Sequence, residues 1–172
     1  MIKAILATGL NGEIGQNGDM PWGKSLPKDL EYFKKVTSDG SVILMGNTTH
    51  QSLPFFPKGL PQRKNYVVTN NGRGEQESGV VKLSLDTFKR CYNTGDSVFN
   101  FFGTWVVGGA SIYEQFWKYV DEVHLTVVNK TYPEADTFFK PDLSNFEKVG
   151  SPIDVSSEDL GAMVQVWRKK GL

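Results

Sequence analysis

Three short apolar runs that each end in a glycine constrain the fold of this chain most. Taken with their glycines, these runs are residues 2–9, 41–46 and 105–109. Apolar runs this short are typical of strands that are buried on both faces of a parallel sheet. Helices alternate with strands through most of the chain, and further strands follow at the C-terminus. We therefore expect an α/β fold with a mostly parallel central sheet, an antiparallel C-terminal edge and about four flanking helices.

Turn residues and helix caps set the expected boundaries. A chain of 172 residues is long enough for a large core but short for two independent ones, so we expect one domain over residues 1–172. Residues 73–78 are expected to form a polar, mobile loop, residues 93–100 a polar connector, and Asp39-Gly40 a break after the first helix. Helices are expected at about 27–37, 47–53, 84–92 and 110–119, and strands at 2–8, 41–45, 65–69, 80–83, 105–107, 122–129, 136–139, 146–149 and 163–167.

Charge and cysteine content exclude several classes of protein. The 19 Lys and Arg residues balance 19 Asp and Glu residues without a dense basic cluster, so we expect neither nucleic acid nor an anionic membrane as a partner. The single Cys91 excludes an internal disulfide, and His50 and His124 are too far apart in sequence to suggest a metal site. No apolar run approaches the roughly 18 residues of a membrane span, and the N-terminus has no cleavage pattern. These features predict a cytoplasmic protein without a metal.

One acid stands out in the segment 14–36, which passes from a Gly- and Asn-rich loop into a helix at about Pro27. Helical spacing puts Asp29 on the same side as Leu30 and Phe33. A carboxylate in an apolar stripe is costly to bury unless it is paired, protonated or bound to a ligand, which makes Asp29 a candidate for a raised pKa and a functional role. The alternative is a partly exposed first-turn acid that the helix dipole favours, and spacing alone favours that alternative.

Two glycine sites precede helices. Gly108-Gly109 and Gly46 each allow the backbone to approach a phosphate and leave helix N–H groups directed toward it. The dinucleotide fingerprint GxGxxG is absent, and a glycine pair at such a corner is more often simple turn chemistry. Two such sites nevertheless suit an extended dinucleotide better than one does.

Arg63, at the start of a strand, is either a bidentate partner for a carboxylate or a solvated loop residue. By pattern alone, Thr126 is an ordinary strand residue, and Met20 and Trp22 belong to a surface loop.

Several segments occur together, in this order, in one enzyme family: IGQNGDMPW (14–22), LPKDLEYFK (26–34), VILMG (42–46), LPQRKNYVV (60–68), VVGGASIYEQF (106–116), HLTVV (124–128) and ADTFF (135–139). The sequence resembles dihydrofolate reductase from Ile2 to the C-terminal strands. A Pro-Trp pair before a helix with an inward acid, an arginine after Leu-Pro, and GGxxxYEQF after a strand make the resemblance specific.

The resemblance implies hydride transfer from NADPH to C6 of 7,8-dihydrofolate, with N5 protonated, to give tetrahydrofolate for one-carbon metabolism and thymidylate synthesis. It also implies that antifolates such as methotrexate bind and that the protein is a monomer. The cofactor supplies the hydride, while the protein supplies orientation, a dry pocket and one negative charge.

The resemblance also implies roles for individual residues. Asp29 would bind the amino-pyrimidine edge of the substrate and Thr126, and Trp22 would help to hold a water near Asp29. Met20 would lie on a mobile loop that closes over the nicotinamide, with Tyr113 nearby. Arg63 would bind the glutamate α-carboxylate. The residues implied to line the folate site are Ile5, Leu6, Ala7, Leu30, Phe33, Thr49, Leu53, Leu60 and Val107. Those implied to hold the dinucleotide are Ala7, Ile14, Met20, Gly46, Asn47, Thr48, Thr49, Thr69, Asn70, Gly108, Gly109, Ala110, Ser111, Ile112, Gln115 and Thr137.

The glycine pair matches one that is joined by a cis peptide in the family, whereas the chain departs from the family pattern near the phosphates of NADPH. Many members have basic residues where this chain has Asn47 and Ser111, and a serine where it has Asn70. We hypothesise that Arg73 or Lys82 supplies charge for the 2′-phosphate; failing that, discrimination against NADH is weak and NADH also serves. Residues 24–25 resemble a small insertion that should alter loop closure but not the chemistry.

Two other functions are compatible with parts of the pattern. A pyrimidine reductase of riboflavin synthesis shares the Gly-Gly cofactor site, but it gives no reason for Trp22, Asp29 and Arg63 together. A non-catalytic module that binds a pterin or a dinucleotide is the second alternative, and the intact set of site residues argues against it.

Overall fold

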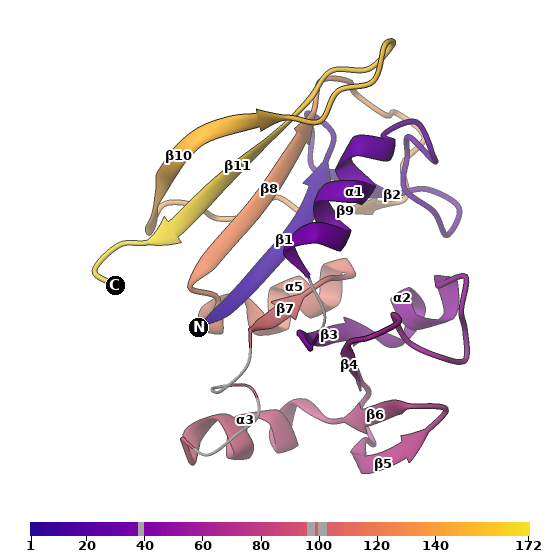
Figure 1. Cartoon of the computed structure of the whole chain (residues 1–172), viewed down its shortest axis with the longest axis vertical. Helices are drawn as coiled ribbons and strands as arrows, with labels where there is room; N and C mark the ends of the chain where they lie inside the picture. The colour runs from indigo at the N-terminus through magenta and orange to yellow at the C-terminus, as the bar shows by residue number, and fades with distance from the viewer. Residues whose placement is uncertain (38–39, 96–98, 100–102) are drawn as a thin grey trace. The chain divides into compact units, whose positions relative to one another are not determined.

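The structure is a computed structural model that describes residues 1–37, 40–95, 99 and 103–172. The predicted break at Asp39 lies outside the described residues, as do residues 96–98 and 100 of the predicted polar connector. The chain forms two compact units, which are described separately (Figure 1). Unit 1 consists of Met1–Ala4 and Thr37–Val120, and unit 2 consists of Ile5–Val36 and Asp121–Leu172.

Unit 1 is built on parallel strands in the order β1-β7-β3-β4-β6, with β5 antiparallel to β6 at the edge. Its strands are β1 (Ile2–Thr8, which continues into unit 2), β3 (Val42–Gly46), β4 (Lys64–Val68), β5 (Arg73–Glu77), β6 (Val80–Leu83) and β7 (Thr104–Val106). Its helices are α2 (Asn47–Ser52), α3 (Leu85–Asn93) and α5 (Ala110–Phe116), which continues into the 3₁₀ helix η1 (Trp117–Tyr119).

Local sequence explains most of these elements. All five residues of β3 are buried, as expected for a continuous apolar run in a parallel sheet. Ser84 caps α3, because its hydroxyl oxygen accepts a hydrogen bond from the N–H of Thr87 at 3.1 Å. Phe88 of α3 is fully buried, and its ring packs edge-on against Phe116 at 4.8 Å between centroids. Burial of such a side chain contributes about 1.5–3 kcal/mol to stability.

The predicted mobile loop at residues 73–78 is wrong, because residues 73–77 form strand β5. All five side chains of β5 are exposed, so the segment lacks the apolar pattern by which a strand is identified from sequence. Ser78 and Gly79 both have positive φ angles, 53° and 78°. Such angles at two successive residues are typical of the tight turn that returns the chain into an antiparallel hairpin. The turn, rather than burial, therefore positions β5 against β6.

Unit 2 contains an antiparallel edge and helix α1 (Pro27–Val36). Its sheet strands follow the order β10-β11-β8-β1, and both β10–β11 and β11–β8 are antiparallel. In Figure 1, α1 is drawn in front of the end of β1, and its side chains Asp29 and Tyr32 are hydrogen-bonded to β8. The further strands of unit 2 are β2 (Glu13–Gly15), β8 (Glu122–Val128), β9 (Thr137–Phe138), β10 (Phe146–Asp154) and β11 (Ala162–Lys169).

The strand predicted at 136–139 does not lie on the edge of the main sheet. Its central residues form β9, which pairs with β2 in a separate two-stranded sheet. Strand β2 is absent from the predicted elements, because three residues next to a Gly-rich loop give no periodic signal. The pairing of β2 with β9, which is distant in sequence, therefore explains both the missed strand and the misplaced one.

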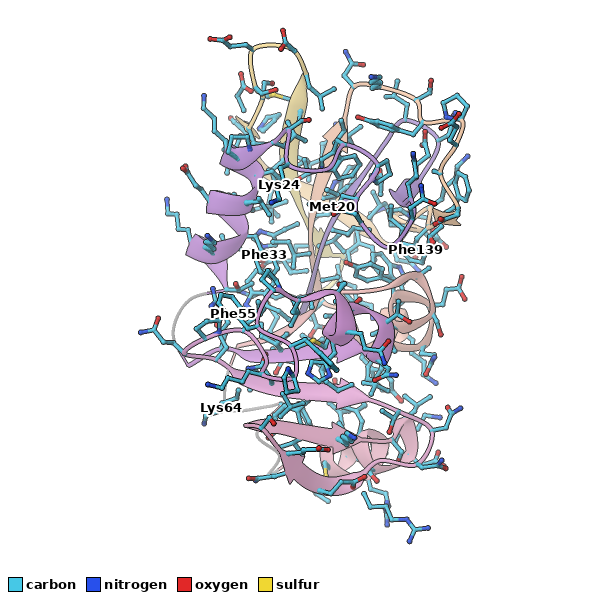
Figure 2. The ribbon with its side chains drawn as sticks, turned by 90° about the vertical axis from the view of Figure 1, so that its right-hand side faces the viewer. Met20, Lys24, Phe33, Phe55, Lys64 and Phe139 are labelled. Atoms are coloured by element: carbon cyan, nitrogen blue, oxygen red, sulfur yellow. The ribbon has the colours of Figure 1, made fainter. Side chains whose placement is uncertain are left out.

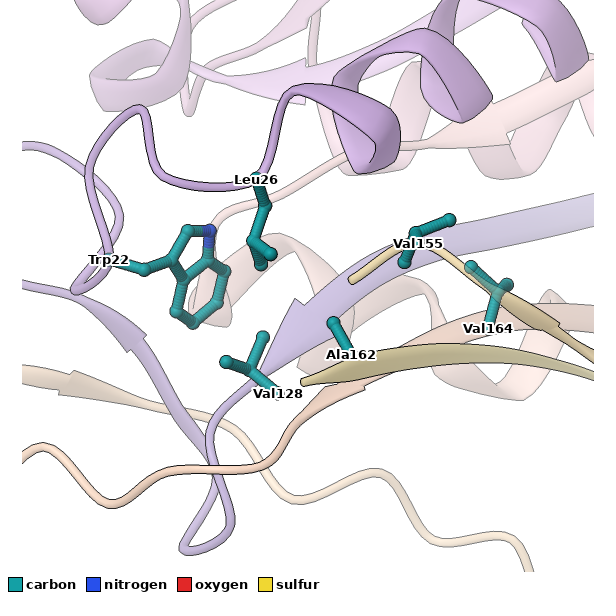
Figure 3. Packing of buried hydrophobic residues seen from close by; sticks show 6 residues of the cluster. All are labelled: Trp22, Leu26, Val128, Val155, Ala162 and Val164. Atoms are coloured by element: carbon teal, nitrogen blue, oxygen red, sulfur yellow. The ribbon is translucent and has the colours of Figure 1, made fainter. Parts of the chain in front are cut away.

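The core of unit 2 includes a cluster around Trp22, which is 6% exposed. Figure 3 shows Trp22 and Leu26, from the segment before α1, packed with Val128 of β8. The remaining members of this cluster are Val155, Ala162 and Val164. Because Trp22 is an anchor in this core, the loop that precedes α1 is fixed at that point.

The expected fold class, a mostly parallel α/β sheet with an antiparallel C-terminal edge, is confirmed. The described ranges contain four α-helices, as expected. Among the described residues, no helix is long and apolar enough to span a bilayer.

Candidate active site

Asp29 lies in the first turn of α1, where its Oδ1 atom accepts a hydrogen bond from the hydroxyl of Thr126 on β8 at 2.7 Å. Thr126 is buried, whereas Asp29 is half-buried. Burial raises the pKa of Asp29 above its usual value, and the hydrogen bond from Thr126 lowers it by a smaller amount. The fold therefore brings together two predicted site residues and gives the acid a raised pKa.

The loop before α1 holds Met20 and Trp22. The Met20 carbonyl accepts a hydrogen bond from the N–H of Gly23 at 2.9 Å, and the Trp22 ring lies 5.8 Å from the Tyr132 ring. Met20 is half-buried, and Lys24 of the predicted insertion is exposed on the turn that follows (Figure 2). Trp22 is thus fixed by packing within unit 2, while the insertion faces solvent.

The other folate-site residues of unit 2 differ in burial. Ile5 and Leu6 of β1 are buried, and Ala7 and Phe33 are half-buried. Leu30 is 39% exposed, although helical spacing placed it in the apolar stripe. Leu30 is therefore not part of the buried stripe that the spacing predicts.

In unit 1, two backbone carbonyls orient the guanidinium group of Arg63. Its Nε donates to the carbonyl of Thr37 and its Nη1 donates to the carbonyl of Pro61, the latter at 2.8 Å. A guanidinium group held in this way has a defined orientation toward a planar partner such as a carboxylate. The other folate-site residues of this unit are Thr49, Leu53, Leu60 and Val107, all of which are half-buried.

The glycines predicted at the cofactor site lie close together in unit 1. The peptide bond between Gly108 and Gly109 is cis, as the resemblance implied. The N–H of Gly46 donates to the carbonyl of Gly108 at 2.8 Å, and a Cβ atom at Gly46 would lie 2.8 Å from Cγ1 of Ile112. Helices α2 and α5 begin after Gly46 and Gly109 without a side-chain cap. Their first N–H groups are therefore arranged as an anion requires.

The remaining cofactor residues divide between the units. In α5, Gln115 donates a hydrogen bond to Ser111 at 2.8 Å, and Tyr113 is buried, which raises the pKa of its hydroxyl. Asn47, Thr48, Ala110, Thr69 and Asn70 also lie in unit 1, at the starts of α2 and α5 and after β4. Ile14 of β2 and Thr137 of β9 lie in unit 2.

A polar pocket of about 370 Å³ lies beside Asn70 in unit 1. Arg73 of β5 and Arg90 of α3 both line it, together with one acid, Asp86. Lys82 is instead 3.4 Å from the carboxylate of Glu77. The other residues that line the pocket are Asn71, Gly72, Ser84 and Thr87.

Sequence reasoning missed a row of hydrogen-bonded polar side chains, buried at Glu122 and His124, that begins one helical turn after Asp29. It runs from Tyr32 of α1 through His124 and Glu122 of β8 to Arg168 of β11. The signal was present as alternation, because Glu122, His124 and Thr126 are spaced to share one face of a strand. Their partners come from elements distant in sequence, which pattern alone does not reveal. Within the described ranges, no group of three or more His, Cys, Asp or Glu side chains is arranged to hold a metal ion.

Comparison with known proteins agrees with this arrangement. The sequence profile of the family described as "Dihydrofolate reductase" matches residues 1–165. A dihydrofolate reductase of Bacillus subtilis is 36% identical over 152 residues, which cover 88% of this chain and 83% of the relative. A putative dihydrofolate reductase of Caenorhabditis elegans is 33% identical over 181 residues, which cover 99% and 92% of the two chains. A solved structure of dihydrofolate reductase from Enterococcus faecalis, complexed with NADP(H) and RAB-propyl, is 27% identical and superposes with a TM-score of 0.79 over 99% of this chain and 96% of the other. This chain therefore belongs to the dihydrofolate reductase family.

Proposed function

We propose that Asp29 and Thr126 bind the pteridine ring of 7,8-dihydrofolate in the NADPH-dependent reduction to 5,6,7,8-tetrahydrofolate. The observation that carries the proposal is the 2.7 Å hydrogen bond from Thr126 to the Asp29 carboxyl group, half-buried between α1 and β8. The Thr126 hydroxyl donates a hydrogen bond to one oxygen of Asp29. The carboxylate can accept further hydrogen bonds from the amino-pyrimidine edge of the substrate. A protein of this family is an oxidoreductase, and its hydride comes from NADPH.

The charge of Asp29 serves the proton step. N5 of dihydrofolate is a weak base, and a carboxylate in surroundings of low dielectric constant favours its protonated form. We assign the immediate proton donation to water, with Trp22 helping to position that water and Met20 helping to exclude bulk solvent. Asp29 thus tunes the protonation of N5, while Arg63 binds the carboxylate at the other end of the substrate.

The cofactor residues of unit 1 fit a dinucleotide. The uncapped starts of α2 and α5 offer N–H groups to its phosphates, and only glycine fits at position 46 because a Cβ atom there would lie 2.8 Å from Cγ1 of Ile112. We assign the dinucleotide to these helix starts, with Thr69 and Asn70 on the adenine side and Tyr113 near the nicotinamide. When bound, NADPH supplies the hydride. Because hydride transfer requires both ligands in contact, the two groups of residues serve one reaction.

Discrimination between NADPH and NADH is assigned to Arg73, together with Arg90. Asn47 and Ser111 offer no charge to a 2′-phosphate, and Lys82 is already within 3.4 Å of Glu77. Arg73 and Arg90 line the same pocket as Asn70, and two arginines outnumber the one acid there. Guanidinium groups are well suited to a phosphate because they donate paired hydrogen bonds. Of the two cations named in the sequence hypothesis, this arrangement favours Arg73.

The experiment that tests the function is the loss of nicotinamide absorbance when purified protein meets dihydrofolate and NADPH, with and without methotrexate. Methotrexate-sensitive turnover is the expected result. Tight methotrexate binding without turnover would instead indicate a non-catalytic binding module. Absence of both turnover and binding would indicate the pyrimidine reductase of riboflavin synthesis, which the family match does not favour.

Cofactor selectivity is tested by the ratio of Michaelis constants for NADPH and NADH in wild type, Arg73→Ala and Arg90→Ala. We expect the KM for NADPH to rise about tenfold for each variant and that for NADH to stay unchanged, because a charge-assisted hydrogen bond at an exposed site contributes near the lower end of about 1.5–3 kcal/mol. Lys89→Ala is the matched control, because Lys89 lies on α3 with Arg90 but does not line the pocket. An unchanged ratio in Arg73→Ala would remove Arg73 from this role.

The organisation of the protein in the cell completes the proposal. We propose that residues 1–172 act as one dihydrofolate reductase-like domain, that the protein is a cytoplasmic monomer, and that it does not bind nucleic acid. The balanced charge of 19 basic and 19 acidic residues supports the last point. Light scattering at micromolar concentration tests the monomer.

A further inference from the structure

Helix α1 carries Asp29, yet none of the side chains along Pro27–Val36 is fully buried. The Tyr32 ring packs against the cluster around Trp22, and further contacts are needed to fix the rotation of the helix about its own axis. Two side-chain hydrogen bonds to β8 perform this task, one from each of two successive turns. Asp29 is bonded to Thr126 at 2.7 Å, and the hydroxyl of Tyr32 is 2.5 Å from Nδ1 of His124.

The hydrogen bond between Tyr32 and His124 is the end of a longer row of hydrogen-bonded side chains. The Nε2 atom of His124 is 2.7 Å from Oε1 of Glu122, and Oε2 of Glu122 is 3.1 Å from Nη2 of Arg168 on β11. Glu122 and His124 are 6% and 8% exposed. Since alternate residues of a strand share a face, Glu122 and His124 lie on the same face of β8 as Thr126. The strand thus presents a continuous polar row to α1.

The Glu122 carboxylate sets the direction of its own bonds with His124 and Arg168. This carboxylate, paired with Arg168, only accepts hydrogen bonds, so Nε2 of His124 carries the proton. In the neutral imidazole, Nδ1 is then an acceptor, and the Tyr32 hydroxyl donates to it. Burial, followed by the charges of Glu122 and Asp29, raises the pKa of Tyr32 to about 12. Tyr32 therefore remains a protonated donor at neutral pH.

We infer that Tyr32 is a positioning residue for the Asp29 carboxylate, held through His124, Glu122 and Arg168. This inference rests on the proposed function, because it assigns Asp29 to the substrate. Tyr32 follows Asp29 by three residues, so the two side chains lie on the same face of α1. Fixing Tyr32 on His124 fixes the rotation of α1, and that rotation holds Asp29 within hydrogen-bond distance of Thr126. None of these four side chains touches substrate or cofactor, so each acts through Asp29.

Loss of the Tyr32 hydroxyl has a defined consequence for the proton step. The hydrogen bond from Thr126 lowers the pKa of Asp29, while burial raises it. If α1 rotates and this bond lengthens, the lowering contribution weakens and the pKa of Asp29 rises further. A protonated Asp29 no longer favours protonation of N5, so hydride transfer should slow at neutral pH and its pH profile should move to lower pH. A residue that only stabilises the fold would not produce this movement.

The test is the variant Tyr32→Phe, measured by stopped-flow hydride transfer from NADPH to dihydrofolate across pH, beside wild type. We expect a roughly three- to tenfold lower rate at neutral pH, a midpoint of the pH profile at lower pH, and an unchanged KM for NADPH, because Tyr32 is not among the residues assigned to the cofactor. Tyr119→Phe, which removes a hydroxyl from η1, is the matched control and should leave both the rate and the midpoint unchanged.

A second variant measures coupling to the carboxylate. In the Asp29→Asn background, Tyr32→Phe should lower the rate by a smaller factor than it does in wild type, because the charge that Tyr32 positions is gone. An equal factor in both backgrounds would overturn the inference, as would a lower melting temperature with unchanged rate and midpoint. A wild-type protein without turnover would contradict the proposed function itself, whereas an unaffected Tyr32→Phe beside an active wild type would contradict only this inference.

Discussion

Asp29→Asn separates the charge of the site from its shape. The hydrogen bond from Thr126 to the Asp29 carboxylate is 2.7 Å long. Asparagine keeps an oxygen that can accept this bond and loses only the negative charge. We expect kcat/KM for dihydrofolate at neutral pH to fall by about 10²–10⁴, the usual contribution of a positioned acid–base group, which corresponds to about 3–5 kcal/mol of transition-state stabilisation. The assay is stopped-flow hydride transfer with saturating NADPH.

The pH dependence gives the sharper test of the reasoning. At acid pH the substrate is protonated without help, so the loss in Asp29→Asn should shrink as pH falls. Glu31→Gln changes an exposed carboxylate of the same helix and should have no effect at any pH. A loss of equal size across the pH range would refute the claim that the charge of Asp29 assists protonation of N5.

The same substitution should affect stability in the opposite direction. The pKa of Asp29 is raised above 3.8 in the folded state, because burial penalises the charged form. The folded state therefore binds a proton more tightly than the unfolded state, and stability decreases as pH rises from about 3.8 to the raised pKa. Asparagine does not ionise, so Asp29→Asn should melt at a higher temperature than wild type above this window. A lower melting temperature at pH 8 would contradict the assigned burial cost.

Two further substitutions test other parts of the site and the fold. Arg63→Leu should weaken methotrexate binding by about 2–5 kcal/mol if the partner carboxylate is desolvated, whereas an unaltered Kd from calorimetry would return Arg63 to the role of a loop residue. Glu13 is 1% exposed, and its burial alone would raise its pKa. Hydrogen bonds from its own N–H group and from those of Tyr132 and Asn11 together outweigh this effect and lower the pKa below 4.5. Its stabilising contribution is present above pH 4.5 and is lost as pH falls through the lowered pKa. Urea unfolding of Glu13→Gln should therefore show a loss of about 1.5–3 kcal/mol at pH 7 that narrows in acid, and a constant difference would contradict this assignment.

The buried parallel strands and the helix that carries Asp29 were predictable from local pattern. The run Val42–Gly46 is apolar throughout, and a run this short is typical of a strand buried on both faces, so no information about partners was needed. Ser84 marks the start of α3 for an equally local reason, since its side chain caps the helix. Strand β5 was missed because its exposed side chains carry no periodic signal and its turn decides its pairing.

The candidate site was likewise predictable only where it depends on residues that are adjacent in the chain. The sequence by itself determined that Asp29 lies in the first turn of a helix and that glycines precede α2 and α5, because helical spacing and glycine content are properties of adjacent residues. The family resemblance implied that Thr126 meets Asp29, although local pattern did not, whereas only the tertiary structure decided that Tyr32 meets His124 and that Arg73 and Arg90 share a pocket. Asp29 and Thr126 are 97 residues apart. The pKa of a carboxyl group depends on burial and on donors brought from such distances, so it is decided by the fold and not by neighbours in the chain.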